Sequence, residues 1–311
     1  MADKKATREA YGAALAEFGA DERIVVLDAD LSKSTKTESF KKVYPDRFIN
    51  CGIAEANMVC VAAGLAACGK IPFASSFAMF AAGRAFEQIR NSICYPGLNV
   101  KIGATHAGIT VGEDGATHQC LEDIALMRTL PGMVILNPAD AVEARLAVKA
   151  AIEHDGPCYL RFGRLAVNQI FDENYKFEIG KGVELKDGND VTIVATGLMV
   201  ENALIAADML AEEGIAARVI NIATIKPIDK DIIIKASKET GAIVTAEEHN
   251  VIGGLGSAVA EVLCENAPCV LKRIGTKDVF GCSGTPAKLM EKYGLTAKDI
   301  ANSAKEAIKE K

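Results

Sequence analysis

The most informative segment of the sequence is Thr105-His-Ala-Gly-Ile-Thr-Val-Gly-Glu-Asp-Gly-Ala-Thr-His-Gln119, which follows the apolar run Leu98-Asn-Val-Lys-Ile-Gly103. The run predicts a buried strand, and the polar loop after it lies where open α/β sheets bind their ligands. Two of the four histidines and two adjacent carboxylates fall in this loop. Its three glycines, at 108, 112 and 115, permit backbone conformations that side chains forbid.

Three side chains of this loop are candidates for chemistry. We expect His106, Asp114 and His118 to converge on one small polyhydroxylated substrate. The alternative is an ordinary surface loop in which Asp114-Gly115 forms a turn. The density of reactive residue types in so short a segment favours a functional site.

Outward from this loop, short apolar runs alternate with helical patterns, which predicts parallel sheets covered by helices on both faces. Residues 162–190 lack clear periodicity, and α/β alternation then resumes from residue 191. The predicted fold class is α/β with two doubly wound parallel-sheet domains, at residues 1–165 and 191–311, joined by a linker at 166–190. Strands are expected at 23–28, 47–50, 71–76, 98–103, 133–136, 158–161, 191–195, 217–221, 242–245 and 269–273. Helices are expected at 8–18, 54–67, 81–93, 121–128, 140–154, 199–213, 229–239, 254–264 and 297–309.

Composition excludes several functional classes. The 311 residues are 50% hydrophobic with a net charge of −6, and no basic tract suggests nucleic acid or an anionic membrane as a partner. The sequence starts Met-Ala-Asp-Lys-Lys, without the apolar core of a signal peptide, and no apolar run reaches the ~20 residues of a membrane span. Nine cysteines, most of them in apolar runs and none in a Cys-x-x-Cys pair, indicate reduced, buried thiols in a cytoplasmic protein.

Two further motifs suggest other ligand classes. Gly253-Gly-Leu-Gly256 follows a predicted strand and opens a helix, but its spacing differs from the dinucleotide-binding Gly-x-Gly-x-x-Gly. Close packing of the helix start is the favoured interpretation. A metal site built from His106, Glu113, Asp114 and His118 has no pair at helical i, i+4 spacing. Nucleotide binding at the glycine motif and metal binding by the loop are therefore both disfavoured.

The order of motifs along the whole chain resembles transketolase. Each motif follows one of the first predicted strands: Asp30-Leu-Ser-Lys-Ser34, Gly52-Ile-Ala-Glu55, Phe77-Ala-Met-Phe80 and the 105–119 loop. Leu160-Arg161 ends the first domain. The Gly-Glu-Asp-Gly-x-Thr-His-Gln signature is specific, and deoxyxylulose phosphate synthase shares it. The resemblance implies a pyrimidine-binding domain at 1–165 and a transketolase C-terminal domain at 191–311.

One element of that family is missing. Thiamine diphosphate enzymes bind the diphosphate and its metal through Gly-Asp-Gly followed by Asn, and no Gly-Asp-Gly is present here. The chain therefore resembles the C-terminal subunit of a split transketolase of the pentose phosphate pathway. A separate N-terminal subunit would hold the diphosphate and a divalent metal (Mg²⁺ or Ca²⁺), in an α2β2 assembly containing a homodimer of this chain.

The resemblance assigns four residues to the thiamine diphosphate pocket. The Glu55 carboxyl would hydrogen-bond N1′ of the aminopyrimidine ring, although a plain first-turn carboxylate is the alternative. Phe77 and Phe80 would pack that ring, whereas two aromatics at i, i+3 are otherwise typical of a core. Asp30 matches a further acid of the pocket. The third aromatic of the family falls at Gly83, so the ring cradle is either less complete or filled by a neighbour such as Phe86.

Substrates are expected to be sugar phosphates, whose phosphate ends suit arginine forks and hydroxyl donors. By resemblance, Asp114 reads a sugar hydroxyl and His118 lies near the C1 hydroxyl and the developing alkoxide. The family often carries Asp after the first loop histidine, whereas this chain has Ala107, so acceptor preference is expected to differ. The matching phosphate-binding positions are Arg8, Ser34, His106 and Arg161, with Arg164 close by and a surface salt bridge as the alternative role of each arginine.

The implied activity is transfer of a two-carbon ketol unit from a ketose phosphate to an aldose phosphate, with catalytic Glu55, His106, Asp114 and His118. Three alternatives stay open. Two are enzyme subunits, of the deoxyxylulose phosphate synthase type and of the 2-oxoacid dehydrogenase β type. The third is a non-catalytic scaffolding subunit, which the joint presence of the four catalytic residues disfavours.

Overall fold

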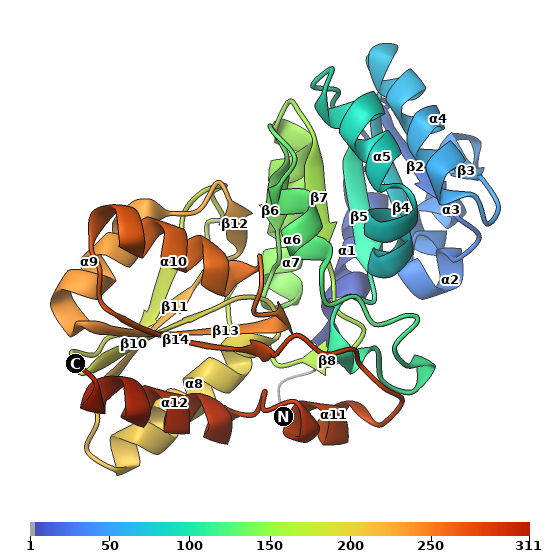
Figure 1. Ribbon diagram of the computed structural model, residues 1–311. Helices are drawn as coiled ribbons and strands as arrows, with labels where there is room; N and C mark the ends of the chain where they lie inside the picture. The colour runs from blue at the N-terminus through green and yellow to red at the C-terminus, as the bar shows by residue number, and fades with distance from the viewer. Residues whose placement is uncertain (1–3) are drawn as a thin grey trace.

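The computed structural model describes residues 4–311 and contains two main sheets, each between two layers of helices (Figure 1). The seven-stranded sheet has the order β12-β6-β7-β5-β4-β2-β3, and the five-stranded sheet has the order β14-β13-β10-β11-β9. All strand pairs in these sheets are parallel except β12 with β6 and β9 with β11. The predicted α/β class with two mainly parallel sheets is confirmed.

The N-terminal elements build most of the seven-stranded sheet, together with the short antiparallel pair β1–β8. Their bounds are β1 (Lys5–Ala6), α1 (Thr7–Phe18), β2 (Ile24–Asp28), α2 (Ser32–Thr35), α3 (Glu38–Val43), η1 (Pro45–Arg47), β3 (Phe48–Asn50), α4 (Glu55–Ala67), β4 (Ile71–Phe77), η2 (Met79–Arg84), α5 (Phe86–Gln88), η3 (Ile89–Cys94), β5 (Lys101–Thr105), η4 (Ile109–Asp114), α6 (Asp123–Arg128), β6 (Val134–Leu136), α7 (Ala141–Glu153), β7 (Cys158–Arg161) and β8 (Ala166–Val167).

The remaining elements form the five-stranded sheet and its helices, which we call the C-terminal unit. Their bounds are β9 (Val183–Lys186), β10 (Val191–Ala195), α8 (Met199–Glu212), β11 (Ala217–Asn221), β12 (Thr224–Lys226), α9 (Lys230–Thr240), β13 (Ala242–Asn250), α10 (Leu255–Asn266), β14 (Val270–Thr276), α11 (Pro286–Lys292) and α12 (Ala297–Lys309). Strand β12 belongs to this segment but pairs in the seven-stranded sheet.

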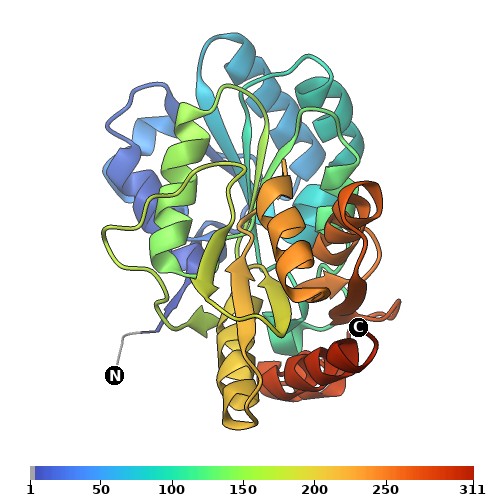
Figure 2. The same cartoon turned by 90° about the vertical axis from the view of Figure 1, so that its left-hand side faces the viewer.

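Burial follows the alternation of side chains along each central strand. Leu27 and Ala74 face a core made with α4, η2, η3 and α6, whereas Val26 and Phe73 face a core made with α1 and α7. The five-stranded sheet is covered in the same way, by α8 and α12 on one face and by α9 and α10 on the other (Figure 1). Figure 2 shows α8 and α12 at the end of the molecule opposite α4.

The segment 166–190, which was predicted as a linker, contains two short strands in the structure. Part of the expected linker forms β8, and β9 adds an antiparallel edge strand to the five-stranded sheet. The two sheets also share apolar packing, because Ile225 and Ala258 of the C-terminal unit join the core on the α4 side. The domain boundaries at 165 and 190 stay predictions. Within residues 4–311, no helix is both long enough and apolar enough to cross a membrane.

Candidate functional site

The predicted site residues follow the carboxyl ends of adjacent parallel strands. Asp30 comes after β2, Phe77 ends β4, and His106 comes after β5. Ligands of open α/β sheets bind in crevices at this edge. The loop glycines 108, 112 and 115 all have positive φ, between +77° and +84°, as their predicted role requires.

Glu55 is the first residue of α4, and its side chain is only 3% exposed. Its carboxylate lies 3.3 Å from the Arg84 guanidinium, and the Ser76 hydroxyl donates a hydrogen bond to it at 3.4 Å. The same guanidinium lies 4.3 Å from the centroid of the Phe80 ring. The Glu55 carboxylate is therefore held near the Phe80 ring, and the Arg84 guanidinium contacts both.

The two predicted phenylalanines and the two loop histidines form one aromatic cluster. Phe77 and Phe80 stack with centroids 5.8 Å apart, and His106 stacks on Phe77 at 3.8 Å. His118 meets Phe80 edge-on at 5.4 Å. The pair at i, i+3 therefore lies beside the loop histidines at the strand ends, rather than within one of the main cores.

His106 has an unusual backbone and a defined protonation state. Its φ is +56°, in the left-handed region that is costly for a residue with a side chain. Burial, and then the charges of Arg8 and Arg164, lower the pKa of His106 to about 3. Because Arg8 is always protonated, Arg8 Nη1 donates to His106 Nε2 at 3.0 Å. The proton of the neutral ring is then on Nδ1, which donates to Thr105 Oγ1 at 2.9 Å.

Arg8 connects His106 with a second predicted residue. Its Nη1 donates to the main-chain oxygen of Ser34 at 2.9 Å, so three of the four predicted phosphate-binding residues meet at one place. Arg8 and Arg164 also line one cavity of about 240 Å³ at the base of the loop. Two guanidinium groups in a small hollow suit a doubly charged phosphate end.

Arg161, the fourth predicted phosphate-binding residue, lies elsewhere. It is 3% exposed, and its Nε donates to Asp123 Oδ2 at 2.8 Å inside the protein. Arg164 instead lies 3.8 Å from Asp114, and its Nη1 donates to the main-chain oxygen of Val111. The structure thus places Arg161, the last residue of β7, in the protein interior, and Arg164, in the loop after β7, beside Arg8 and the site loop. Phosphate binding by either arginine stays a prediction.

The other predicted residues surround this centre. Asp30 has a φ of +66°, and its carboxylate accepts a hydrogen bond from Asn50 Nδ2 at 2.9 Å. His118 Nδ1 lies 2.9 Å from Thr117 Oγ1. Ala107 is buried and donates its N–H to the Phe162 oxygen, and the altered acceptor preference expected from this position stays a prediction.

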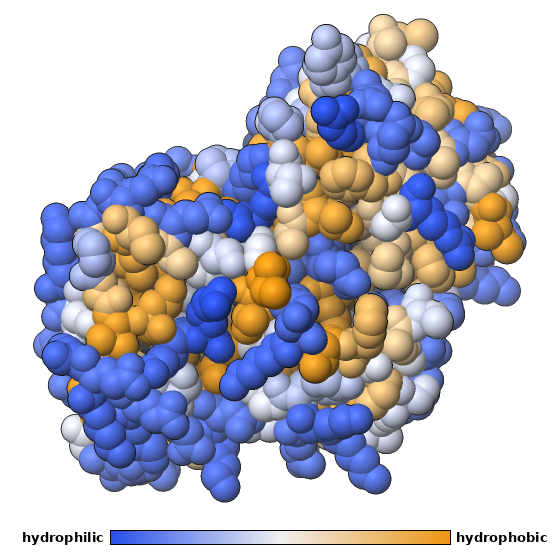
Figure 3. Space-filling model, in the orientation of Figure 1, coloured by the Kyte–Doolittle hydropathy of each residue, from blue (hydrophilic) through white to orange (hydrophobic). Residues whose placement is uncertain are grey.

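A larger cavity of about 710 Å³ adjoins the aromatic cluster and extends to the C-terminal unit. Phe80, Gly83 and Arg84 line one side, and Phe280 of the C-terminal unit, which is 86% exposed, lines another. Phe86 packs against the core on the α4 side and is not among the residues that line this cavity. Figure 3 shows apolar surface spread over the part of the molecule that contains α4 and α5.

Two residues near the site have no counterpart among the sequence predictions, namely Arg84 and Phe280. Arg84 could have been found from its i, i+4 spacing to Phe80, since such pairs meet on a helix. Phe280 lies far along the chain and carries no local signal. Among residues 4–311, no group of three or more His, Cys, Asp or Glu side chains is placed to hold a metal ion.

Known families and proteins match most of the chain. Residues 3–169 match the family model "Transketolase, pyrimidine binding domain", and residues 180–300 match "Transketolase, C-terminal domain". The chain is 53% identical over 309 residues to a "Putative transketolase C-terminal section" of Methanocaldococcus jannaschii, covering 98% of this chain and 97% of that one. It is 47% identical to the "6-deoxy-6-sulfo-D-fructose transketolase subunit SqwH" of Clostridium sp. (strain MSTE9), covering 98% and 95%.

A solved structure is also similar over nearly the full length. "Split gene transketolase, inactive beta4 tetramer" has 59% identity and a TM-score of 0.92, covering 98% of both chains. Each of these relatives is therefore of about the same length as this chain.

Proposed function

Because this chain belongs to the transketolase family and forms its C-terminal half, we propose that it transfers a two-carbon ketol unit between sugar phosphates together with a separate N-terminal subunit. The observation that carries the proposal is the meeting of Glu55, Phe77, Phe80, His106 and His118 at the ends of adjacent strands. A scaffolding subunit has no need of such a cluster.

The family depends on thiamine diphosphate, and the residues present fit one part of that cofactor. Glu55 and the rings of Phe77 and Phe80 offer a carboxyl and an aromatic surface of the kind that an aminopyrimidine needs. When bound, the cofactor supplies the carbon nucleophile. We assign to Glu55 a hydrogen bond to the pyrimidine, to Phe77 and Phe80 the packing of its ring, and to Asp30 a neighbouring contact.

The substrate would be oriented by the loop and by the two arginines. Neutral His106 offers no positive charge, so it contacts sugar hydroxyls or a phosphate only as a hydrogen-bonding group. His118 and Asp114 lie on the same loop for hydroxyl contacts. Arg8 and Arg164, with Ser34 beside Arg8, would hold the phosphate end.

The N-terminal subunit is proposed for what this chain does not supply. The sequence lacks Gly-Asp-Gly, and residues 4–311 offer no clustered ligands for the divalent metal that would accompany the diphosphate.

The outer side of α4 supports an assembly, because Cys60, Gly64 and Ala67 are exposed there next to Ile53, which is 77% exposed. We propose α2β2 stoichiometry with a homodimer of this chain. A relative titled as a beta4 tetramer supports such self-association.

A complementation assay tests the activity. The chain is mixed with an N-terminal transketolase subunit, thiamine diphosphate and Mg²⁺, and sedoheptulose 7-phosphate is followed from xylulose 5-phosphate and ribose 5-phosphate. We expect activity only in the mixture, lost in Glu55→Ala and kept in the control Glu212→Ala, whose exposed carboxylate lies on α8. Activity of this chain alone would contradict the two-subunit proposal.

The choice of sugar is tested in parallel. The Arg8–Arg164 hollow suits a sulfonate as well as a phosphate, and one relative is named for 6-deoxy-6-sulfo-D-fructose. We propose the pentose phosphates as substrates. Turnover of 6-deoxy-6-sulfofructose, with no turnover of xylulose 5-phosphate, would overturn that choice while keeping the reaction type.

A further inference from the structure

The loop that carries His106, Asp114 and His118 is held by the C-terminal unit as well as by its own sheet. Thr110 N–H donates to Glu248 Oε1 at 2.5 Å. Gln119 Nε2 donates to the Cys282 oxygen at 3.0 Å, and Ser283 Oγ donates to the Glu113 oxygen at 2.6 Å. Residues 248, 282 and 283 all follow the long linker, so the C-terminal unit reaches the site loop at three places.

We propose that Glu248 is a positioning residue, whose carboxylate fixes the backbone of the loop through the Thr110 amide and thereby places His106 and Asp114 for reaction. This inference rests on the proposed function. It gives the C-terminal unit a part in the reaction, although that unit contributes none of the four predicted catalytic residues.

The shape of the loop at Gly108 matches the Glu248 carboxylate. Gly108 has a φ of +84°, and a Cβ at this position would lie 2.2 Å from Glu248 Cδ. The carboxylate therefore occupies the space that a side chain at 108 would need. Gly108 N–H is itself bound to the Cys120 oxygen at 2.9 Å, which closes the loop around the contact.

The contact between Glu248 and Thr110 lies in a buried, charged environment. The side chain of Glu248 is 4% exposed, and burial raises its pKa to about 7, while the Arg161 charge and the Thr110 N–H lower it. Arg161 also donates to the main-chain oxygen of Glu248 at 3.0 Å and to Asp123. The Arg161 charge favours the ionised carboxylate, and an ionised acceptor makes a stronger hydrogen bond to the Thr110 N–H than a neutral one. The buried Arg161 therefore strengthens the hydrogen bond between Glu248 and the Thr110 N–H.

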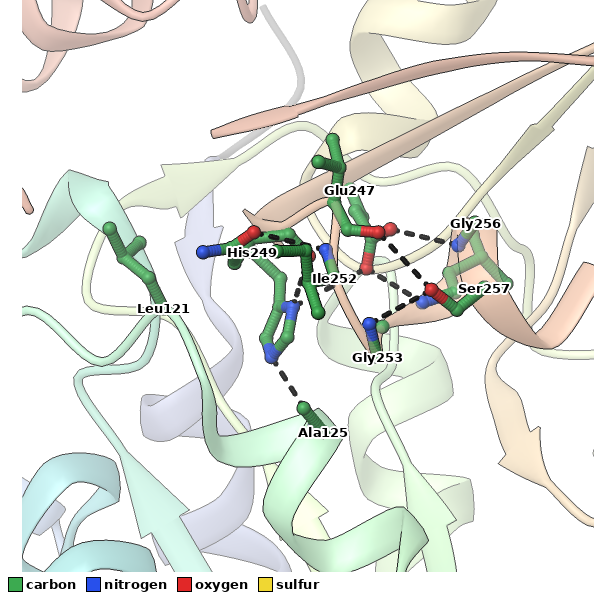
Figure 4. A network of polar contacts seen from close by, with 12 residues as sticks. Leu121, Ala125, Glu247, His249, Ile252, Gly253, Gly256 and Ser257 are labelled. Atoms are coloured by element: carbon green, nitrogen blue, oxygen red, sulfur yellow. Dashed lines mark hydrogen bonds and ion pairs between the residues drawn. The ribbon is translucent and has the colours of Figure 1, made fainter. Parts of the chain in front are cut away.

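The neighbouring Glu247 provides a matched comparison. Successive residues of a strand point to opposite faces, and Glu247 points toward the start of α10 (Figure 4). There it accepts hydrogen bonds from Leu255 N–H at 2.7 Å and Gly256 N–H at 2.8 Å. Its burial also raises its pKa to about 7. Glu247 and Glu248 thus differ in what they hold rather than in how buried they are.

Hydrogen exchange of the chain itself tests the inference without partner or substrate. In Glu248→Ala, the peptide covering residues 106–119 should exchange about tenfold faster than in wild type. In Glu247→Ala, faster exchange should appear at the start of α10 and leave the 106–119 peptide unchanged. Unchanged exchange of that peptide in Glu248→Ala, or an equal increase in both variants, would overturn the inference.

Kinetics of the assembled enzyme separate positioning from stability. We expect Glu248→Ala to lower kcat by about tenfold with a smaller change in KM, because a displaced loop misorients bound substrate. Glu248→Gln keeps an acceptor oxygen and should recover part of kcat. If the alanine variant does not fold, the Glu248→Gln variant tests the positioning role instead. A Glu247→Ala enzyme with the same loss of kcat would overturn the inference. A preparation without transketolase activity in any variant would refute the proposed function, while the exchange result would still decide the role of Glu248.

Discussion

Arg161 and Arg164 are three positions apart and have opposite surroundings. Arg161 is buried against Asp123, whereas Arg164 lines the small cavity with Arg8. We expect Arg164→Gln to raise KM for phosphorylated sugars about 10- to 100-fold with little change in stability, since a charged hydrogen bond contributes about 1.5–3 kcal/mol. Arg161→Gln should instead lower the free energy of unfolding by about 3–5 kcal/mol, because Asp123 loses its buried partner.

Steady-state kinetics and thermal unfolding of both variants check this assignment. A raised KM in a folded Arg161→Gln enzyme, with Arg164→Gln unaffected, would restore the original expectation from the sequence.

The protonation state of His106 leads to a pH prediction. Its folded pKa of about 3 lies below the unfolded value of about 6.5. Below pH 6.5 the unfolded chain therefore binds more protons at this residue, and the contribution of His106 to stability is lost as the pH falls toward 3. The slope is at most about 1.4 kcal/mol per pH unit. Histidine NMR signals, assigned by their loss in His106→Gln, should show no titration of His106 between pH 8 and 5. A midpoint near 6.5 would contradict the neutral, Arg8-bound ring.

At the scale of single residues, the sequence was informative where a motif follows a strand directly. Glu55, Phe77 and His106 lie within a few residues of strand ends, so the sheet edge determines their place. Arg161 and Arg164 could not be distinguished in the same way. The assignment depends on whether β7 ends before or after the arginine, and strand ends are decided by tertiary packing.

Helix α4 has small residues on its outer side, at Cys60, Gly64 and Ala67, beside the polar Asn57. Gly64 lies on that outer side, and a Cβ there would meet no atom within 4 Å of the chain itself. If this side is the subunit interface, we expect Gly64→Gln to reduce self-association, because a long polar side chain would prevent the partner subunit from packing closely against α4. Ala211→Gln, an equivalent change on the exposed side of α8, should leave the assembly unchanged.

Light scattering coupled to size-exclusion chromatography measures the outcome for both variants. An unchanged mass for Gly64→Gln would exclude the outer side of α4 from the homodimer interface.

Among the elements, those with a strong local pattern were predicted well. The predicted strand at 158–161 and the predicted helix at 297–309 agree with β7 and α12. The predicted helix at 81–93 is instead divided at Ala85, whose φ and ψ are −105° and 14°, into π-helical turns on either side of α5. Strands β9 and β12 were not predicted, because segments of three or four residues are too short to show a hydrophobic periodicity. Their strand conformation depends on pairing with the rest of the sheet.

On the scale of the whole molecule, the two sheets are joined by more than a linker. Strand β12 pairs with β6, and Lys226 Nζ donates to the Arg128 oxygen at 2.9 Å and to the Leu130 oxygen. Calorimetry should therefore show one unfolding transition, with equal van't Hoff and calorimetric enthalpies. Lys226→Ala should lower stability by about 1–3 kcal/mol through the carbonyls left unpaired, and still unfold in one step. Two separate transitions in wild type would show that the sheets unfold independently.

Strand β12 also defines which pieces of this protein can be exchanged between relatives. A chimera joined in the segment 166–190 would combine the seven-stranded sheet of one parent with β12 of the other. The pair β6–β12 would then consist of two strands that did not evolve together. The same crossover would separate the site loop from Glu248. Recombination is therefore best tolerated when residues 4–311 are inherited as one block, which makes the whole chain, rather than either sheet, the unit of exchange.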